Sequence, residues 1–460
     1  MNPHESLIAP VLKQLRDSHH SGVLLSIDAR RSALRKLLTA IDDNEVRITK
    51  ALKYDLGKSS FESYVCEIAF IKEEIKSALA SIGKWSQKRF VPTPITFQPG
   101  QSYIQPSPKG VVLIIAPWNY PFQLSLAPLV CTIAAGNCAL IKPSELAAAS
   151  EQVIHDLIHD YLDKNCFRVL NGDMHLASAL TKTPFDHIFY TGSTEIGKIV
   201  MENAAKNLTP VTLELGGKCP VIIDDNVDID LAAKRIMWAK SLNAGQTCIA
   251  PDYVLINKNL IPAFVKAAKK YLEKMFGTNP ENSPDYGRII NQRHTERLIN
   301  YLPQARIACG GKYNVTTRFI EPTILIDVHE TAPVMQEEIF GPILPLIEIK
   351  NIDNAINKIN QRNHPLALYI FSKKQKTIKN ICDQTLSGSV AINDCISQVA
   401  IGGLPFGGVR HSGIGSYHGQ FGFETFSHMR AVHKRANILD NPIKYPPYSK
   451  AKLNIARLVL

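Results

Sequence analysis

The stretch that decides the fold is KGVVLIIAPWNYPF, residues 109–122. Its continuous apolar run, VVLIIA, is typical of a parallel-sheet strand that is buried on both faces. A proline-containing turn follows, and a helix is expected to begin near Phe122. A buried strand that leads directly into a helix is the repeating unit of a doubly wound α/β sheet.

The alternation of strand and helix continues along the chain. CALIKP, FRVLNG and HIFYTG are expected strands, and TEIGKIVMENAAKNL after the last of them is an expected helix. A second cycle begins after VTLELGGKCPVIID, with helices at 228–242 and 260–275 and later strands from TILID to SGSVAIND. The pattern predicts two α/β lobes. Amphipathic helices at 26–90 precede them, and the proline-rich segment 90–110 is expected to form an extended arm.

Composition excludes several classes of protein. The chain has 460 residues, 45% hydrophobic and 20% charged, which is enough for two or three domains with large cores. The net charge is +11, but Lys and Arg are spread along the expected helices, which favours a solvated surface over a nucleic-acid site. The nine cysteines show neither a CxxC pair nor zinc spacing, so we expect free thiols and no metal site.

No stretch of about 18 apolar residues occurs, and the N-terminus lacks the apolar core of a signal peptide. We therefore expect a cytoplasmic protein without a transmembrane segment. The tail from Lys444 to Leu460 is basic and has apolar residues between its charges. We expect it to pack on the protein's own body; weak contact with a membrane surface through a helix is the alternative.

Three residues are candidates for chemistry. Cys248, in NAGQTCIAPDYV (243–254), follows a small polar turn of the kind that a reactive thiol needs. Glu214, in LELGG, is costly to bury as an anion and would by default face water, although the two glycines after it let a ligand approach. Asn119 lies in the turn after the strand VVLIIA. Its amide either donates to an oxyanion or satisfies its own turn.

Two further motifs suit a nucleotide. Gly192-x-x-x-x-Gly197-Lys198 resembles a phosphate loop, but Ile199 replaces the Ser or Thr that would hold magnesium, so an ATPase is disfavoured. A pyrophosphate at the helix N-terminus and a plain strand-to-helix turn remain as alternatives. Lys142 and Glu145 follow another strand, where they either contact ribose hydroxyls or form an ordinary surface beside a helix cap.

Taken together, seven ordered motifs carry a resemblance. They are APWNYP, KPSE, FYTGSTEIGK, LELGGK, NAGQTCIAPDYV, EEIFGPILP and LPFGGVRHSGIGSYHG. From about residue 26 to 435 the chain resembles the aldehyde dehydrogenase superfamily. ALKYDLGKS and GSYHGQFGFETFSH are similar to its class 3 branch, which includes fatty and aromatic aldehyde dehydrogenases.

The resemblance implies NAD(P)-dependent oxidation of medium- or long-chain aliphatic or aromatic aldehydes to carboxylic acids. It makes Cys248 the nucleophile that forms a thiohemiacetal and then a thioester, Glu214 the base that activates the hydrolytic water, and Asn119 the oxyanion donor. The cofactor, NAD or NADP, is expected to contact seven residues: Lys142, Glu145, Gly192, Ser193, Gly197, Glu338 and Phe340.

The resemblance also implies a domain plan and a homodimer. A variant Rossmann domain that binds NAD(P) is expected at 1–88 and 106–212, and a catalytic domain at 213–415. Segments 89–105 and 416–435 are expected to serve oligomerisation, and 436–460 to form a tail. Arg410 and Gln398 depart from the branch's usual glycine and histidine, so the loop near Arg410 and the aldehyde tunnel are expected to differ.

Three rival functions remain. Transfer of the thioester to coenzyme A is disfavoured by Glu214 together with the class 3 signatures. A binding or scaffold protein is disfavoured because Cys248, Glu214 and Asn119 are all present. Cofactor-free ester hydrolysis would use the same nucleophile, so it is expected as a side activity rather than as a distinguishing one.

Overall fold

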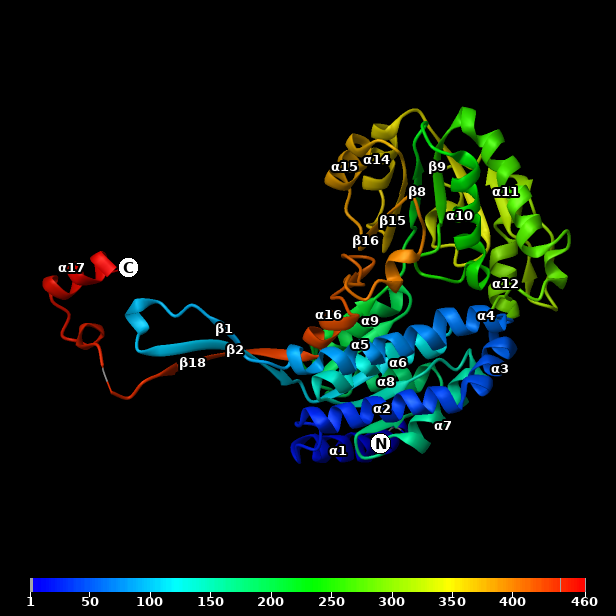
Figure 1. Cartoon of the computed structure of the whole chain (residues 1–460). Coiled ribbons are helices and arrows are strands. Elements are labelled where there is room, and N and C mark those ends of the chain that lie inside the picture. Colours follow the sequence, from blue (N-terminus) through cyan, green and yellow to red (C-terminus); the bar gives the residue numbers. More distant parts are fainter. Residues whose placement is uncertain (1–2, 439, 460) are drawn as a thin grey trace.

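Two α/β lobes and a long β arm make up the protein, as Figure 1 shows for the computed structural model, which describes residues 3–438 and 440–459. The fold class that the sequence predicts is therefore confirmed. Among the described residues, no helix has both the length and the apolar character needed to cross a membrane.

The first lobe contains a six-stranded sheet in the order β17-β7-β6-β3-β4-β5. Neighbouring strands are parallel except for β17, which runs antiparallel to β7. Every residue of β3 is buried, as its apolar run predicts. The strands are β3 Val111–Ile115, β4 Cys138–Lys142, β5 Phe167–Val169, β6 His187–Thr191, β7 Val211–Glu214 and β17 Gly413–Ile414.

The strand order reverses between β3 and β6. After β3 the chain adds β4 and β5 on one side, and it then returns to place β6 and β7 on the other. In open α/β sheets a crevice forms at such a reversal, outside the carboxyl ends of the strands. Asn119 follows β3, Gly192 follows β6 and Glu214 ends β7, so the topology brings three of the predicted residues to this edge.

Helices cover both faces of this sheet (Figure 1). The linking helices are α6 Pro121–Ala135, α7 Ala148–Tyr161, α8 Met174–Thr181 and α9 Thr194–Ala205. The N-terminal helices are α1 Pro3–His20, α2 Ile27–Asp43, α3 Glu45–Leu56, α4 Ser60–Ser63, a π-helical turn at Tyr64–Ile68, and α5 Ala69–Trp85. The helical run is broken after Leu56, because Gly57 ends α3 in a left-handed conformation with φ of 66°. Helix α1 was not predicted.

The second lobe contains a seven-stranded sheet in the order β10-β13-β14-β9-β8-β15-β16, in which only β10 is antiparallel. Its strands are β8 Pro220–Ile223, β9 Tyr253–Asn257, β10 Arg306–Cys309, β13 Thr323–Ile326, β14 Ile343–Ile349, β15 Ala367–Phe371 and β16 Ser389–Ile392. Its helices are α10 Ile229–Ser241, α11 Ile261–Phe276, α12 Gln292–Ile299, α13 Pro333–Gln336, α14 Ile352–Asn360 and α15 Gln375–Gln384. A small hairpin pairs β11 Tyr313–Asn314 with β12 Phe319–Ile320.

The glycine-rich segment 402–419 forms a loop system that contains β17 and leads into α16 Gly419–Thr425. Short 3-10 turns lie at Ile95–Phe97, Leu242–Gly245, Lys258–Leu260, Pro280–Asn282, Leu302–Gln304, Ser397–Ala400 and Pro442–Lys444.

The arm is a three-stranded antiparallel sheet of β1 Arg89–Val91, β2 Gly100–Pro108 and β18 Ser427–Arg435. It extends away from the lobes, and helix α17 Lys450–Val459 lies at its far end (Figure 1). The expectation that the tail packs on the protein's own body is therefore wrong. The nine-residue pairing of β18 with β2 carries the chain out along the arm before the tail begins.

Candidate active site

Cys248 lies in the second lobe, on the loop that follows α10. Three consecutive residues before it have left-handed backbone conformations: Asn243 with φ of 50°, Ala244 with 51° and Gly245 with 76°. A side chain at Gly245 would meet the Gly341 carbonyl oxygen at 2.3 Å, so glycine is required there. Non-glycine residues rarely adopt this conformation, and such strain is held in place only by surrounding contacts.

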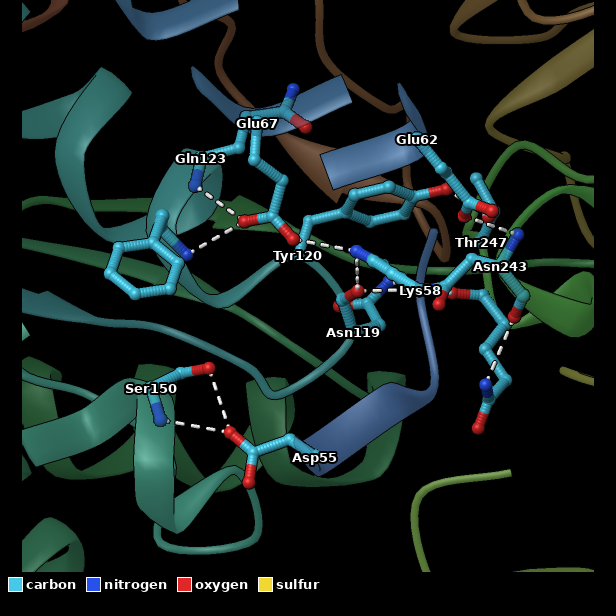
Figure 2. A network of polar contacts seen from close by, with 12 residues as sticks. Asp55, Lys58, Glu62, Glu67, Asn119, Tyr120, Gln123, Ser150, Asn243 and Thr247 are labelled. Atoms are coloured by element: carbon cyan, nitrogen blue, oxygen red, sulfur yellow. Dashed lines mark hydrogen bonds and ion pairs between the residues drawn. The ribbon is translucent and has the colours of Figure 1, made fainter. Parts of the chain in front are cut away.

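Those contacts are hydrogen bonds to buried side chains. The Gln246 amide donates to the carbonyls of Asn243 and Arg288, both at 2.9 Å, and accepts from the Ile290 N–H at 2.9 Å. The Thr247 hydroxyl lies 2.7 Å from the Tyr120 hydroxyl, which belongs to the first lobe (Figure 2). The loop that presents Cys248 is therefore fixed from both lobes.

Two cavities meet at Cys248. One, of about 180 Å³, is mostly apolar, and the other, of about 330 Å³, is more polar. Five residues border both cavities: Leu124, Thr191, Glu214, Leu215 and Cys248. The half-buried thiol thus opens into two internal spaces.

The apolar cavity is lined by residues from many separated segments of chain. The π-helical turn contributes Val65 and Cys66, helix α10 contributes Trp238, and the 3-10 turn at 397–400 contributes Val399. The remaining lining residues are Phe70, Tyr120, Gln123, Leu242, Thr247, Ile249, Leu366, Ile396, Ser397, Ala400, Phe406 and Tyr417. Such walls suit an apolar organic molecule that ends at the thiol.

Glu214 is buried at the end of β7, and neither of its carboxyl oxygens has a hydrogen-bond partner within the protein. The expectation that a lone glutamate here would face water is wrong, because the β7 strand directs the side chain into the cavities. Burial raises the pKa of this carboxyl well above its ordinary value. An unpartnered buried carboxyl that borders two cavities is available for proton transfer to a ligand.

The glycines after Glu214 also have a defined neighbour. A side chain at Gly216 would lie 1.9 Å from a carboxyl oxygen of Glu338. The group that approaches this backbone is therefore the Glu338 carboxyl, which also accepts a hydrogen bond from the Gly217 N–H. Burial raises the pKa of Glu338 to about 8, with a further contribution from Asp252.

Asn119 is buried in the turn after β3. Its side-chain amide donates to the main-chain carbonyl of Gln246 at 3.1 Å. Its own main-chain carbonyl oxygen accepts from the Asn243 side-chain amide at 2.8 Å. An amide nitrogen carries two hydrogens, so the second side-chain N–H of Asn119 takes no part in this bond. Asn119 borders the more polar cavity together with Cys248.

Burial raises the pKa of the Cys248 thiol above its ordinary value, and the nearby Glu338 and Glu214 carboxyls raise it further. The N–H groups of Cys248 itself and of Ile249 act in the opposite direction, because they stabilise the thiolate. Without a ligand the thiol is therefore held protonated, and a positive charge brought into either cavity would favour the thiolate.

Exposure alone does not distinguish this cysteine from the others. All nine cysteines are free thiols; five are buried, Cys66 and Cys309 are half-buried like Cys248, and Cys382 is exposed. Cys248 differs from Cys382 in its setting, because it borders both cavities beside an unpartnered carboxyl.

The predicted cofactor residues fall into two groups. Gly192, Ser193, Glu338 and Phe340 border the polar cavity. Ser193 caps helix α9, so the helix N-terminus that was predicted to face a pyrophosphate adjoins this space.

The other predicted cofactor residues lie outside the lining. Lys142 and Glu145 form an ion pair at 2.8 Å beyond β4. Gly197 has a packing role, since a side chain there would lie 2.6 Å from Leu215.

A buried ion pair holds the segment that carries Glu338. Lys218 pairs with Asp252 and donates to the carbonyls of Val334 and Glu337, at 2.9 and 2.8 Å. The Ile339 N–H donates to the same aspartate at 3.0 Å. Both neighbours of Glu338 are thereby fixed through the backbone.

Several residues that line the polar cavity were not predicted from the sequence. Trp118 makes an edge contact with the ring of Phe340 and a tilted contact with that of His294, with centroids 5.3 and 5.4 Å apart. Arg297 and Thr191 also border the polar cavity. Trp118 lies in a recognised motif and could have been noted, whereas His294 and Arg297 come from α12, which carries no local signal.

Neither of the two residues that depart from the family pattern, Gln398 and Arg410, lines either cavity. Gln398 is buried and its amide donates toward the Ser389 hydroxyl at 3.3 Å, while its neighbours Ser397 and Val399 line the apolar cavity. Arg410 is exposed, and its left-handed conformation, with φ of 56°, explains why a glycine suits this position.

Comparisons with known proteins agree with this architecture. Residues 14–432 match the aldehyde dehydrogenase family. Rat aldehyde dehydrogenase family 3 member B1 is 46% identical over 446 residues, covering 96% of this chain and 95% of the relative. The mouse protein named "aldehyde dehydrogenase, dimeric NADP-preferring" is 44% identical and covers 97% and 99%. The solved substrate-bound state of Staphylococcus aureus AldH superposes with a TM-score of 0.96 at 42% identity, covering 98% and 99%.

A cysteine and an unpartnered glutamate lie together on the shared wall of two cavities, in a fold of two α/β lobes that the matched relatives define as an oxidoreductase. The chain belongs to the aldehyde dehydrogenase family, and its activity is the NAD(P)-dependent oxidation of aldehydes.

The charge of Glu338 gives a test of the Cys248 environment. At pH 9 Glu338 is largely ionised, because its pKa is about 8. Glu338→Gln should then lower the pKa of the Cys248 thiol and speed its alkylation by iodoacetamide, by roughly threefold to tenfold. At pH 6 the glutamate is protonated, so the two proteins should react alike. Mass spectrometry of the Cys248 peptide measures both rates.

Cys382 provides the internal control, because it is exposed and should react equally in both proteins. Equal rates for Cys248 in the two proteins at pH 9 would contradict the electrostatic coupling.

Proposed function

We propose that Cys248 is the nucleophile of aldehyde oxidation, Asn119 the oxyanion donor and Glu214 the base that activates water. The observation that carries this proposal is the position of Cys248 and Glu214 on the shared wall of the two cavities. An aldehyde in the apolar cavity and a nicotinamide in the polar cavity would then meet at the same thiol.

In this mechanism the Cys248 thiolate attacks the aldehyde carbon and forms a thiohemiacetal. The uncommitted N–H of Asn119 and the backbone N–H of Cys248 stabilise the negative oxygen. When bound, NAD or NADP accepts the hydride that is lost as the thioester forms. The Glu214 carboxylate then takes a proton from the water that hydrolyses the thioester.

Seven residues would hold the cofactor. Ser193 and the N-terminus of α9 suit its pyrophosphate, and Glu338 with Phe340 suits the nicotinamide ribose and ring. Lys142, Glu145, Gly192 and Gly197 would shape the remainder. The positive charge of an oxidised nicotinamide would lower the pKa of both Cys248 and Glu214, which burial raises in the free protein.

The lobes correspond in this proposal to separate tasks. Residues 1–88 and 106–212 form the NAD(P)-binding domain, and 213–415 the catalytic domain. Segments 89–105 and 416–435 bridge subunits, and 436–460 form the tail. The sheet of the first lobe supports this division for β3 to β6, which lie within 106–212, whereas β7, Val211–Glu214, crosses the boundary. We further propose a cytoplasmic location, in keeping with nine free thiols, with weak membrane contact by the tail as the alternative.

The first test separates the two chemical roles. Glu214→Gln should release about one equivalent of reduced nicotinamide and then stall, because hydrolysis lacks its base; the steady-state rate should fall roughly 100- to 10,000-fold. Intact-mass measurement should find the acyl group on Cys248. Cys248→Ala should show neither the burst nor the adduct. An unchanged steady-state rate in Glu214→Gln would refute the assignment of the base.

The second test concerns the substrate. The apolar lining predicts that kcat/KM rises by about fourfold for each CH₂ from acetaldehyde toward hexanal, since each buried CH₂ contributes about 0.8 kcal/mol. Benzaldehyde should also be oxidised, whereas the cationic betaine aldehyde should be a poor substrate. Reduced nicotinamide formation is followed with NAD⁺ and with NADP⁺. A preference for the cationic aldehyde would contradict the proposal, and product formed only with coenzyme A would favour the acyl-transfer rival.

The third test concerns a homodimer, which we propose from the arm. Phe90, Ile95 and Phe97 are 63%, 79% and 49% exposed on it, more apolar surface than an isolated arm in water would favour. The 51.0 kDa chain should sediment as a dimer. Ile95→Asp should shift it toward the monomer, whereas Leu208→Asp, at a 90% exposed site on the first lobe, should not. A wild-type monomer would refute the proposal.

A further inference from the structure

Beside the site lies a buried ion pair to which the proposed mechanism gives no role. Lys58 and Glu67 have side chains with no exposed surface, and their charged atoms are 2.6 Å apart (Figure 2). The Lys58 ammonium also lies 3.9 Å from the centre of the Tyr120 ring. Taking two charges out of water is unfavourable unless further hydrogen bonds satisfy them, so the partners of this pair show what it holds in place.

The ammonium of Lys58 holds the turn that carries Asn119. It donates to the Asn119 carbonyl oxygen at 2.9 Å, and the Asn243 amide donates to the same oxygen at 2.8 Å. The Asn119 side chain in turn donates to the Gln246 carbonyl at 3.1 Å. Both ends of Asn119 are therefore fixed relative to the Cys248 loop, and Lys58 supplies the contact from the N-terminal helices.

The carboxylate of Glu67 anchors the pair to a helix. Its second oxygen accepts the N–H groups of Phe122 and Gln123, at 2.9 and 3.2 Å, in the first turn of α6. A carboxylate at a helix N-terminus is favoured by the helix dipole. Glu67 lies in the π-helical turn Tyr64–Ile68, and π-helical turns occur frequently at functional sites.

A second carboxylate of the same segment reaches the nucleophile loop. Glu62 is buried and accepts the Asn243 N–H at 2.7 Å, at the first of the three left-handed residues before Cys248. One short segment, 58–67, therefore contacts the backbone beneath both the proposed oxyanion donor and the proposed nucleophile.

We propose that Lys58, held by Glu67, is a positioning residue that fixes Asn119 in the orientation needed to stabilise the oxyanion. This inference rests on the proposed roles of Asn119 and Cys248. Lys58 itself contacts the Asn119 backbone and borders neither cavity, so it acts through Asn119 rather than on the aldehyde.

The test is a cycle of four proteins: wild type, Asn119→Ala, the double variant Lys58→Met/Glu67→Gln, and their combination. Removing both charges together avoids a buried unpaired ion. Asn119→Ala should lower kcat about 100- to 1,000-fold. The double variant should lower kcat roughly 10- to 100-fold, because small misplacements of catalytic groups have effects of that size, and it should leave the KM for the cofactor unchanged.

The combination distinguishes positioning from a structural role. If Lys58 acts through Asn119, the combined protein should be no slower than Asn119→Ala, within about threefold. Losses that multiply, or a double variant with kcat within about twofold of wild type, would overturn the inference. Full activity of Asn119→Ala would instead refute the oxyanion role, and the positioning proposal with it.

Two further variants control for folding. Asp55→Asn alters a comparable buried carboxylate, which accepts from the N–H and hydroxyl of Ser150 at 2.8 and 2.7 Å at the start of α7 (Figure 2). It should lower the melting temperature and leave kcat within about twofold of wild type. Should the double variant fail to fold, Lys58→Arg keeps a cation beside Glu67 but moves the donor that meets the Asn119 carbonyl, and it should lower kcat roughly threefold to tenfold. An unchanged kcat there would overturn the inference.

Discussion

The hydrogen bonds between the Asn119 turn and the Cys248 loop are the contact on which the site depends. Asn119 belongs to the first lobe and Cys248 to the second, and each lobe is organised by its own sheet. The bonds of Asn119 to Gln246 and Asn243 cross from one lobe to the other. A small rotation of either lobe would separate Cys248 from Asn119, so the interface between the lobes sets the geometry of the proposed nucleophile and oxyanion donor.

Burial of charge is the second theme of the structure. Glu62, Glu214 and Glu338 all lie where burial raises their pKa, but the protein treats them differently. Glu62 and Glu338 each accept a backbone N–H, whereas both oxygens of Glu214 are unpartnered. The two partnered carboxyls bind backbone N–H groups, whereas Glu214 has both oxygens free for the proton transfer that we propose.

Much of this could be predicted from the sequence, for physical reasons. The continuous apolar runs predicted buried parallel strands, and the strand-and-helix alternation predicted both lobes. Cys248, Glu214 and Asn119 lie in short motifs and could be named, and the structure brings them to one place. Lys58 lies in the quoted motif ALKYDLGKS, but its contacts could not be predicted, because its partners lie 9 and 61 residues away and only folding brings them together. The tail was misplaced because no local pattern records the direction in which β18 leaves the body.

The two cavities share five wall residues, which lie around the thiol, and their linings are otherwise separate. A molecule in one space does not fill the other. Each proposed reactant would therefore be recognised mainly by walls of its own, so a changed side chain in one lining can alter the selection of one reactant and leave that of the other unchanged. The five shared residues are the exception, because there the charge of an occupant in one cavity can alter the ionisation of a group that also faces the other.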